Sequence, residues 1–401
     1  MALRTIGKAL IENLLRGTGV ELDGRNPCDI VVHNPRFYQR VMRGSLGIGE
    51  SYIDGDWDCL ALDDLFRRVL QAGRLNSPLI RCARAIKVLQ ARFLNLQTRP
   101  RSMAVAEEHY NLDHRMYALF LGPWNQYTCC FFDDTSDLEQ AEINKLEMIC
   151  GKLELQQGER VLDIGCGWGG FAKYAASTRG CEVTGISLSS EQIEYAREFT
   201  AGLPVTIRQL DYRDLPRSGI EPFDKIVIVG MIEHVGHKNY PRLMQVVHQM
   251  LKPDGLFLLH TIGNRDVTAV VDPWVEKYIF RNSMVPAMNQ LIRATQDLFV
   301  IQDWENYGHY YEPTLQAWYD NFNANWEQIR ALDSKQRFDE RFRRMWNYYL
   351  LSCKAAFEVE ELYLWHLVMT RHGSGRGVYD RVRHHTGRQT RAGPDCLQAA
   401  S

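Results

Sequence analysis

The segment IVIVGMIEHVGHKNY, residues 226–240, places an acid and an imidazole side by side, at Glu233 and His234. The apolar run before them has the composition of a buried strand that ends at Gly230. Parallel sheets bind their ligands at the carboxyl ends of their strands, so a carboxylate at this point is placed for chemistry. Glu233 is therefore a candidate acid, base or orienting group. We assign no chemistry to His234 or His237, which we expect to make local hydrogen bonds at a helix start.

A glycine-rich loop, VLDIGCGWGG at residues 161–170, lies between a predicted strand and a predicted helix. Its spacing satisfies G-x-G-x-x-G, through Gly165, Gly167 and Gly170, which is a weak fingerprint for dinucleotides. However, Asp163 precedes the glycines, and the next strand, ending TGISLSSEQ, has no acid for a nicotinamide ribose. A sulfonium cofactor needs a close backbone approach without an anion hole, and an acid suits its cationic aminoacyl end. The loop therefore favours S-adenosylmethionine, with NAD as the alternative.

Four further residues are ambiguous from their pattern alone. Asp211 and Tyr212 close a third predicted strand, where a carboxylate can accept from a nucleoside's exocyclic amine and an aromatic ring can stack on its base. The alternative for this pair is an ordinary loop start. Cys129 is either a small core residue or a functional thiol. His260 ends the apolar run LFLLH and is either a core histidine or a site residue.

The elements that must position these residues alternate between strand and helix from residue 140 onward. This pattern predicts an α/β fold with a doubly wound, mainly parallel sheet. The predicted strands are RVLDIGC, CEVTGIS, VTIRQLD, DKIVIVG and GLFLLHTI, and the predicted helices are AEINKLEMICGKLEL, GFAKYAAS, SSEQIEYAREFTA and YPRLMQVVHQML. We expect a small mixed N-terminal domain at 1–75, a basic linker or helix at 76–104, a catalytic domain at 105–385 and a disordered tail at 386–401.

Composition is that of an ordinary globular chain, with 401 residues, 45% hydrophobic and 24% charged residues and a net charge of -2. The ten cysteines include no paired C-x-x-C motif, so we expect reduced thiols, a cytoplasmic location and no metal. No apolar run reaches the roughly 18–20 residues that span a bilayer, so any membrane contact is expected to be peripheral. No acid occurs between Asp64 and Glu107, and this basic stretch suits an anionic surface or, alternatively, a solvated linker.

Several motifs together resemble the cyclopropane-fatty-acyl-phospholipid synthase family, over about residues 105–370. The motifs are EEHYNLDHRMYALFLGPWNQYTCCFF, LDIGCGWGG, GMIEHVGHKNY, LLHTIG and VDPWVEKYIF. The segment NPRFYQRVMRGSLGIGESYIDGDW is similar to the small N-terminal domain of the bacterial phospholipid enzymes, which the mycolic-acid cyclopropane synthases lack. The resemblance implies a methyltransferase-type fold. It also implies transfer of a methylene group from S-adenosylmethionine to the cis double bond of a phospholipid acyl chain, through a carbocation that bound bicarbonate deprotonates.

The resemblance also implies two sets of site residues. The bicarbonate set would be Cys129, Glu233, His260, the backbone of Ile262, and Tyr311. The cofactor set would be Tyr127, Thr128, Asp163, Gly165, Gly167, Ser187, Leu188, Gln192, Asp211 and Tyr212. Ionised Glu233 can only accept hydrogen bonds, so we expect it to orient the bicarbonate hydroxyl rather than to take the proton. Cys130 departs from the family pattern, because a small residue is commoner there, and leaves open which thiol faces the site.

A carbocation requires a dry pocket whose aromatic faces stabilise the charge. Residues from the motif segments that could supply such faces are Trp124, Tyr127, Phe131, Phe132, Trp274, Tyr278 and Tyr307. As partners we expect a homodimer, by resemblance alone, and unsaturated phospholipid at the inner face of a bacterial membrane, with no nucleic acid. The N-terminal domain and the basic stretch 67–101 would dock there. The alternatives are a methyltransferase giving methyl-branched or methylene products, and a lipid-binding scaffold with a degenerate methyltransferase fold.

Overall fold

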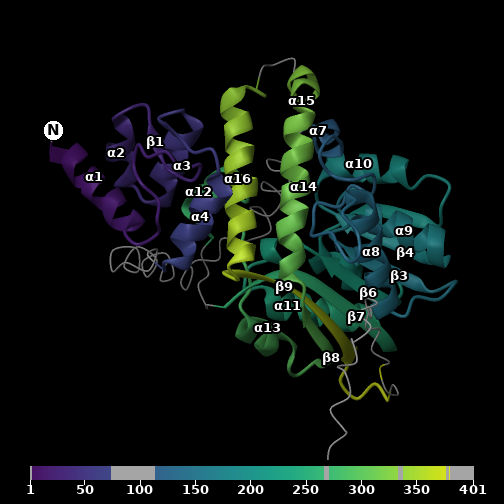
Figure 1. Cartoon of the computed structure of the whole chain (residues 1–401). Coiled ribbons are helices and arrows are strands. Elements are labelled where there is room, and N and C mark those ends of the chain that lie inside the picture. Colours follow the sequence, from purple (N-terminus) through teal and green to yellow (C-terminus); the bar gives the residue numbers. More distant parts are fainter. Residues whose placement is uncertain (1, 74–112, 266–270, 333–336, 376–378, 380–401) are drawn as a thin grey trace, which may run out of the picture.

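The computed structural model describes residues 2–73, 113–265, 271–332, 337–375 and 379. Its main feature is a seven-stranded sheet, in the lower right part of Figure 1. The predicted basic segment 76–104 and the predicted tail 386–401 lie outside these residues. The strand order is β5-β4-β3-β6-β7-β9-β8. The strands are β3 (Arg160–Ile164), β4 (Glu182–Ser187), β5 (Val205–Gln209), β6 (Phe223–Val229), β7 (Leu251–Asn264), β8 (Phe299–Asn306) and β9 (Leu362–Arg371).

The first five strands of that order are parallel, and β9 pairs antiparallel with both β7 and β8. The predicted doubly wound, mainly parallel sheet is therefore confirmed. The antiparallel pairing at one edge was not predicted, because the C-terminal segments carry no strand–helix alternation. The edge brings β9, from the end of the described chain, beside β7.

Helices cover both faces of the sheet, which explains why its strands read as nearly continuous apolar runs. Side chains alternate between the faces, so Val161 and Val227 pack with α8 and α9, whereas Leu162 and Ile226 pack with α11 and α13. Ser189 caps α10, since its hydroxyl accepts from the backbone amide of Gln192 at 3.3 Å. The helices around the sheet are α8 (Leu138–Lys152), α9 (Gly170–Arg179), α10 (Ser190–Phe199), η2 (Tyr212–Arg217), η3 (Ile232–His234), α11 (Tyr240–Met250) and α13 (Met288–Thr295).

A second group of helices stands beside the sheet and joins it to the N-terminal part (Figure 1). The long helices α14 and α16 pack against each other, and α16 also packs against α3 (Ser45–Ile53) and α4 (Leu62–Gln71). The members of this group are α7 (His114–Ala118), α12 (Pro273–Tyr278), η4 (Gly308–Tyr310), α14 (Tyr311–Ala324), α15 (Trp326–Leu332) and α16 (Glu340–Glu358).

Residues 2–73 form four helices around two very short strands. Their core is continuous with that of α12 and α16, and a Cβ on Gly49 would lie 2.3 Å from the ring of Trp274. This contact fixes the N-terminal part against the rest of the chain. Its elements are α1 (Ala2–Leu15), β1 (Val31–Val32), α2 (Arg36–Val41), α3 (Ser45–Ile53), β2 (Trp57–Asp58) and α4 (Leu62–Gln71).

Candidate active site

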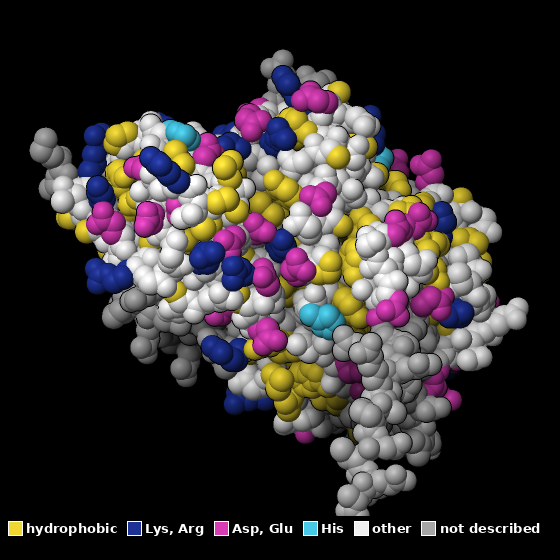
Figure 2. Space-filling model, in the orientation of Figure 1, with side chains coloured by type: hydrophobic (Ala, Val, Ile, Leu, Met, Phe, Trp, Pro, Cys, Tyr) yellow, Lys and Arg dark blue, Asp and Glu magenta, His cyan; other side chains and the backbone are white. Residues whose placement is uncertain are grey.

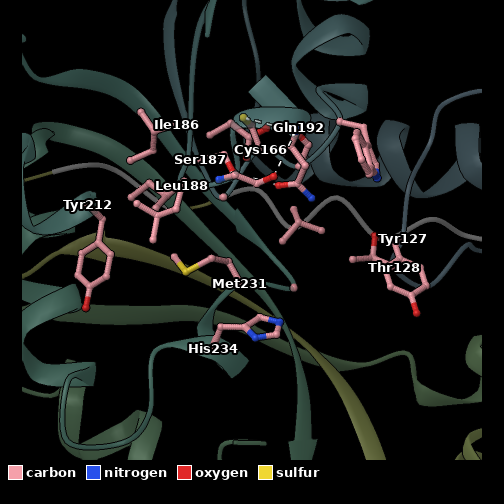
Figure 3. A pocket seen from close by; sticks show the side chains of 18 of the residues that line it. Tyr127, Thr128, Cys166, Ile186, Ser187, Leu188, Gln192, Tyr212, Met231 and His234 are labelled. Carbon is pink, nitrogen blue, oxygen red and sulfur yellow. Dashed lines mark hydrogen bonds between the residues drawn. The ribbon is translucent and has the colours of Figure 1, made fainter. Parts of the chain in front are cut away.

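A cavity of about 200 Å³ opens at the carboxyl ends of β3, β4 and β6. β3 and β6 are neighbours at the point where the strand order reverses, which is where doubly wound sheets bind ligands. Every predicted cofactor residue except Asp211 lines this cavity. In Figure 3, Tyr212 stands on one side, Tyr127 and Thr128 on the other, and Met231 and His234 between them.

The glycine loop forms the wall of the cavity next to β6. Gly165 has a φ of +85°, which strongly favours glycine, and its amide donates to the Ile186 carbonyl at 2.9 Å. A Cβ at this position would lie 2.6 Å from the Met231 side chain. The absence of a side chain at Gly165 therefore lets β3 and the segment after β6 approach closely, and keeps the cavity open between them.

Lys145, a buried lysine that was not singled out from the sequence, supports residues at the floor of the cavity. Lys145 is fully buried on α8, and its Nζ donates to the side chains of Gln126 and Thr128, both of which line the cavity. Burial raises the pKa of Asp163 to about 7, and the Lys145 charge partly opposes the rise. The carboxylate of Glu142 accepts from the amides of Trp124 and Gln126 at 3.1 and 3.2 Å. This network holds the segment 124–128 against the cavity.

The sequence did carry a signal for this network. Glu142, Lys145, Ile149 and Lys152 recur at steps of three and four, so they share one face of α8, and all are buried. Charged residues on an apolar helical stripe indicate a buried polar network.

Asp211 lies beside the cavity but faces its own loop. Its carboxylate accepts from the backbone amide of Arg213 at 2.9 Å and pairs with the guanidinium of the same residue at 2.9 Å. Its neighbour Tyr212 does line the cavity, and burial raises the pKa of its phenol to about 12. The structure thus separates the two members of this predicted pair.

The predicted bicarbonate residues gather directly behind the cavity wall. Met231 and His234 line the cavity, whereas Glu233, between them, is buried on the other side. The Glu233 Oε1 atom accepts from the Ile262 amide at 2.7 Å and from the Thr261 hydroxyl at 3.0 Å. Burial raises the pKa of Glu233 to about 7, which these hydrogen bonds partly oppose. Its Oε2 atom has no hydrogen-bond partner among the described residues.

Two of these contacts were not foreseen. The Ile262 amide, expected to face bicarbonate, donates to Glu233 instead, and Thr261 supplies a second donor. Tyr240 is a further missed neighbour. Its buried hydroxyl lacks a partner within the described part of the chain, and the Glu233 charge adds to burial in raising its pKa.

The adjacent cysteines point to different surroundings. The Cys129 thiol lies 3.7 Å from the Thr314 hydroxyl, and the Cys129 side chain contributes to the raised pKa of buried Tyr311, as does Glu233. The Cys130 thiol contacts the Thr128 carbonyl at 3.7 Å, and after burial the Glu142 charge contributes most to raising its pKa. Cys129 therefore shares the neighbourhood of Tyr311 and Glu233, and Cys130 faces the Lys145 network.

His260 completes this group from β7. Its carbonyl accepts from the Gly230 amide at 3.0 Å, which ties it to the turn after β6. Its ring is buried, and burial lowers its pKa well below the usual value. Its Nδ1 contacts Nε2 of His366 at 2.7 Å, and its Nε2 meets no hydrogen-bond partner in the part of the chain that the structure describes. His366 was not singled out from the sequence.

The aromatic residues expected around the reaction are divided among four places. Tyr127 packs against Phe280 and Trp318, next to the cavity. Phe131 and Tyr307 pack together beside His366. Trp274 and Tyr278 instead contact the N-terminal part, and Trp124 packs on Tyr174.

Together, the strand order and the glycine-loop cavity define the α/β fold of the S-adenosylmethionine-dependent methyltransferases. The family model for mycolic acid cyclopropane synthetase matches residues 97–367, and the chain belongs to this family.

Three similar proteins illustrate the relationship. The cyclopropane-fatty-acyl-phospholipid synthase of Escherichia coli (strain K12) is 45% identical over 90% of this chain and 93% of its own length. The structure of the cyclopropane synthase MmaA2 from Mycobacterium tuberculosis matches with a TM-score of 0.60 and 26% identity, over 67% of this chain and 97% of that one. The mycolic acid cyclopropane synthase CmaA1, complexed with SAH and CTAB, matches with a TM-score of 0.59 and 27% identity, over the same shares.

Proposed function

We propose that this protein transfers a methylene group from S-adenosylmethionine to the cis double bond of unsaturated acyl chains in membrane phospholipids. The product is a cyclopropane ring, formed through a carbocation that bound bicarbonate deprotonates. The observation that carries the proposal is a pair of buried atoms behind the cofactor cavity, Glu233 Oε2 and His260 Nε2, which have no hydrogen-bond partner among the residues that the structure describes. The similarity to the Escherichia coli synthase over nearly the whole chain supports the same substrate class.

The cavity residues fit S-adenosylmethionine, which supplies an electrophilic methyl group when bound. The Asp163 carboxyl would hold the cationic aminoacyl end of the cofactor. The glycine loop would let the cofactor approach its backbone closely. Tyr212 and Leu188 would contact the base, since both line the far wall. Asp211 would act on this wall only through Arg213, which also lines the cavity.

The group behind the wall fits bicarbonate, which supplies a small base when bound. Glu233 Oε2 can accept a hydroxyl hydrogen, and His260 Nε2 can donate to an oxygen anion. The Cys129 thiol and the Tyr311 hydroxyl are additional donors in the same neighbourhood. In this arrangement the Ile262 amide holds the Glu233 carboxylate in place by donating to its Oε1 atom. Glu233 therefore orients the ion, and it must be ionised to do so.

Membrane contact is assigned to the N-terminal part. Leu3, Ile6 and Leu10 form a stripe on α1 and are 56%, 49% and 38% exposed. Arg4 and Lys8 are exposed on the same helix, and Figure 2 shows Lys and Arg side chains beside hydrophobic ones over this region. An apolar stripe flanked by cations suits an anionic lipid surface. No helix among the described residues is long and apolar enough to cross a bilayer.

Homodimer formation and location at the inner face of a bacterial membrane belong to the same proposal. Both are supported by the family resemblance only. Light scattering of the purified chain would test the first, and cell fractionation would test the second.

The function is tested with vesicles of cis-monounsaturated phospholipid and methyl-labelled S-adenosylmethionine. We expect label to enter the acyl chains, and mass spectrometry to find a cyclopropane, which has two hydrogens fewer than a saturated methyl branch. Turnover should fall in buffer depleted of carbon dioxide and return on adding bicarbonate. A methyl-branched or methylene product would show that the protein methylates the acyl chain without closing a ring. Failure of any label to enter the lipid would reject the proposal.

A further inference from the structure

Two buried histidines face each other across the antiparallel edge of the sheet. The register of β7 and β9 pairs His260 directly with His366, so their side chains project from the same face. The His260 Nδ1 and His366 Nε2 atoms lie 2.7 Å apart, which is a hydrogen-bond distance. The outer nitrogens, Nε2 of His260 and Nδ1 of His366, are buried without a hydrogen-bond partner in the described ranges.

The surroundings keep both rings neutral. Burial lowers the pKa of each histidine well below its usual value, and the charges of Lys145 and Lys152 lower both further. The His366 ring also packs against Phe131 and Tyr307, with ring centroids 5.4 and 4.9 Å away. These contacts leave the pair with one proton on each ring.

One hydrogen must lie between the two rings, so only two arrangements are possible. In the first, His366 Nε2–H donates to His260 Nδ1, and His260 carries its own proton outward on Nε2. In the second, His260 Nδ1–H donates to His366, and the outward proton is on Nδ1 of His366. Without a bound anion, each arrangement leaves its outward N–H group without an acceptor among the described residues. With an anion at the proposed position, only the second arrangement leaves a buried N–H group unpaired, at a cost of about 1–3 kcal/mol. The first aims the outward N–H group at the position proposed for an anion.

We propose that His366 is a positioning residue, which donates from its Nε2 atom to Nδ1 of His260 and thereby keeps the proton of His260 on Nε2. His260 is then held as a hydrogen-bond donor toward the oxygen anion that it faces. This inference rests on the proposed function, since it assigns the donor role of the same site. The partner of a catalytic histidine commonly fixes which ring nitrogen is protonated.

The protonation pattern can be read directly from the ¹⁵N spectrum of the full chain labelled at histidine, recorded with S-adenosylhomocysteine and sodium bicarbonate. We expect both His260 and His366 to carry their protons on Nε2. A spectrum with either proton on Nδ1 overturns the proposal. Because this reading needs no turnover, it decides the role of His366 even if the protein makes no cyclopropane.

Two substitutions separate donation from packing. His366→Gln keeps an amide donor near the position of Nε2, so kcat should stay within about threefold of the original. His366→Phe keeps an aromatic ring but no donor, so kcat should fall about tenfold or more, with the KM for S-adenosylmethionine unchanged. Equal losses in the two variants would make His366 a packing residue and contradict the proposal.

Thr370→Val is the matched control. Thr370 is buried on the same strand and accepts from the Gln302 amide at 2.9 Å, without contacting His260. Its loss should lower the melting temperature without changing kcat at a temperature where the variant is folded. Melting curves of all three variants show whether His366→Phe folds. If it does not, the spectrum and the His366→Gln variant still decide the matter.

Discussion

The backbone amide of Ile262 donates to Oε1 of Glu233 at 2.7 Å, and this one contact divides the carboxylate into two different oxygens. Oε1 is held by β7, whereas Oε2 is buried with no hydrogen-bond partner in the described part of the molecule. A carboxylate fixed in this way cannot swing toward a substrate. It can present one accepting atom in a constant direction, which is what orienting a small ion requires.

The first prediction concerns Glu233→Gln. The amide can still accept from Ile262 through its oxygen, but it presents an NH₂ group where Oε2 stood. We expect turnover to fall about 100-fold or more, with S-adenosylmethionine affinity nearly unchanged. Turnover of labelled lipid and calorimetry with the cofactor measure the two effects. Glu327→Gln, at a strongly exposed position, is the control, and unchanged turnover in Glu233→Gln would refute the orienting role.

The pH dependence of turnover follows from the same group. The pKa of Glu233 is raised from 4.5 to about 7, so its ionised form is lost as the pH falls below about 7. Because only the ionised form accepts through both oxygens, kcat should decline on the acidic side with an apparent pKa near that value. A flat profile between pH 5.5 and pH 8, about the range in which such a group titrates, would contradict this.

The free energy of unfolding should change with pH in the opposite direction to turnover, falling as the pH rises. Between pH 4.5 and about 7 the folded chain keeps the Glu233 proton and the unfolded chain does not, so folding is progressively disfavoured as the pH rises. Glu233→Gln removes this effect and should stabilise the fold at pH 8 by up to about 3 kcal/mol relative to its effect at pH 4. Urea unfolding at the two pH values tests this, and a pH-independent difference would show that the carboxyl group is not buried.

Gly165→Ala should weaken cofactor binding. The new Cβ would lie 2.6 Å from the Met231 side chain, in the cavity wall, and the φ of +85° adds strain of about 1 kcal/mol. Gly202→Ala is the matched control, because its φ of +82° carries similar strain but nothing lies within 4 Å of its Cβ. Both variants should lose stability, whereas only Gly165→Ala should lose S-adenosylmethionine affinity. Equal affinities by calorimetry would show that the contact with Met231 relaxes freely.

The buried lysines of α8 provide a further test. Lys145→Met removes the donor that holds Gln126 and Thr128 at the cavity and leaves nearby Asp163 without its compensating charge. We expect a loss of about 3 kcal/mol in stability and at least a tenfold loss of cofactor affinity. Lys152 is as buried as Lys145, and Lys152→Met breaks its ion pairs with the partly buried Asp303 and Glu305, which do not line the cavity. It should destabilise the fold to a similar extent but bind the cofactor normally.

Membrane docking through α1 is tested by the double substitution Leu3→Glu and Leu10→Glu. The acids would place negative charge in the exposed apolar stripe, so binding to vesicles of anionic phospholipid should fall at least tenfold. Turnover on lipid dispersed in detergent should be unaffected. Leu60→Glu, at a 93% exposed position outside α1, is the control. If the double variant sediments with vesicles as well as the original chain does, α1 is not the docking surface.

Much of the fold and of the cofactor cavity could be predicted because its signals are local. Apolar runs of strand length, a serine at a helix start and glycines between strand and helix each act over a few residues. The carboxyl ends of parallel strands meet at one edge of a sheet, so Asp163, Ser187 and Tyr212 could be assigned to one cavity from their places in the chain. The resemblance to a family added the residues behind the cavity wall, which no local pattern would have joined.

Tertiary structure alone decided what those residues contact. His366 stands more than 100 positions after His260 in the sequence, and only the antiparallel register of β9 on β7 places the two rings together. The Ile262 amide was expected to face an ion, but the turn after β6 brings the Glu233 carboxylate to it first. The Asp211 carboxylate pairs with Arg213, two residues further along the chain, and does not line the cavity. Hydrogen-bond partners depend on distances of a few tenths of an ångström between distant segments, and packing sets these distances, whereas periodicity and spacing specify only which face a side chain occupies.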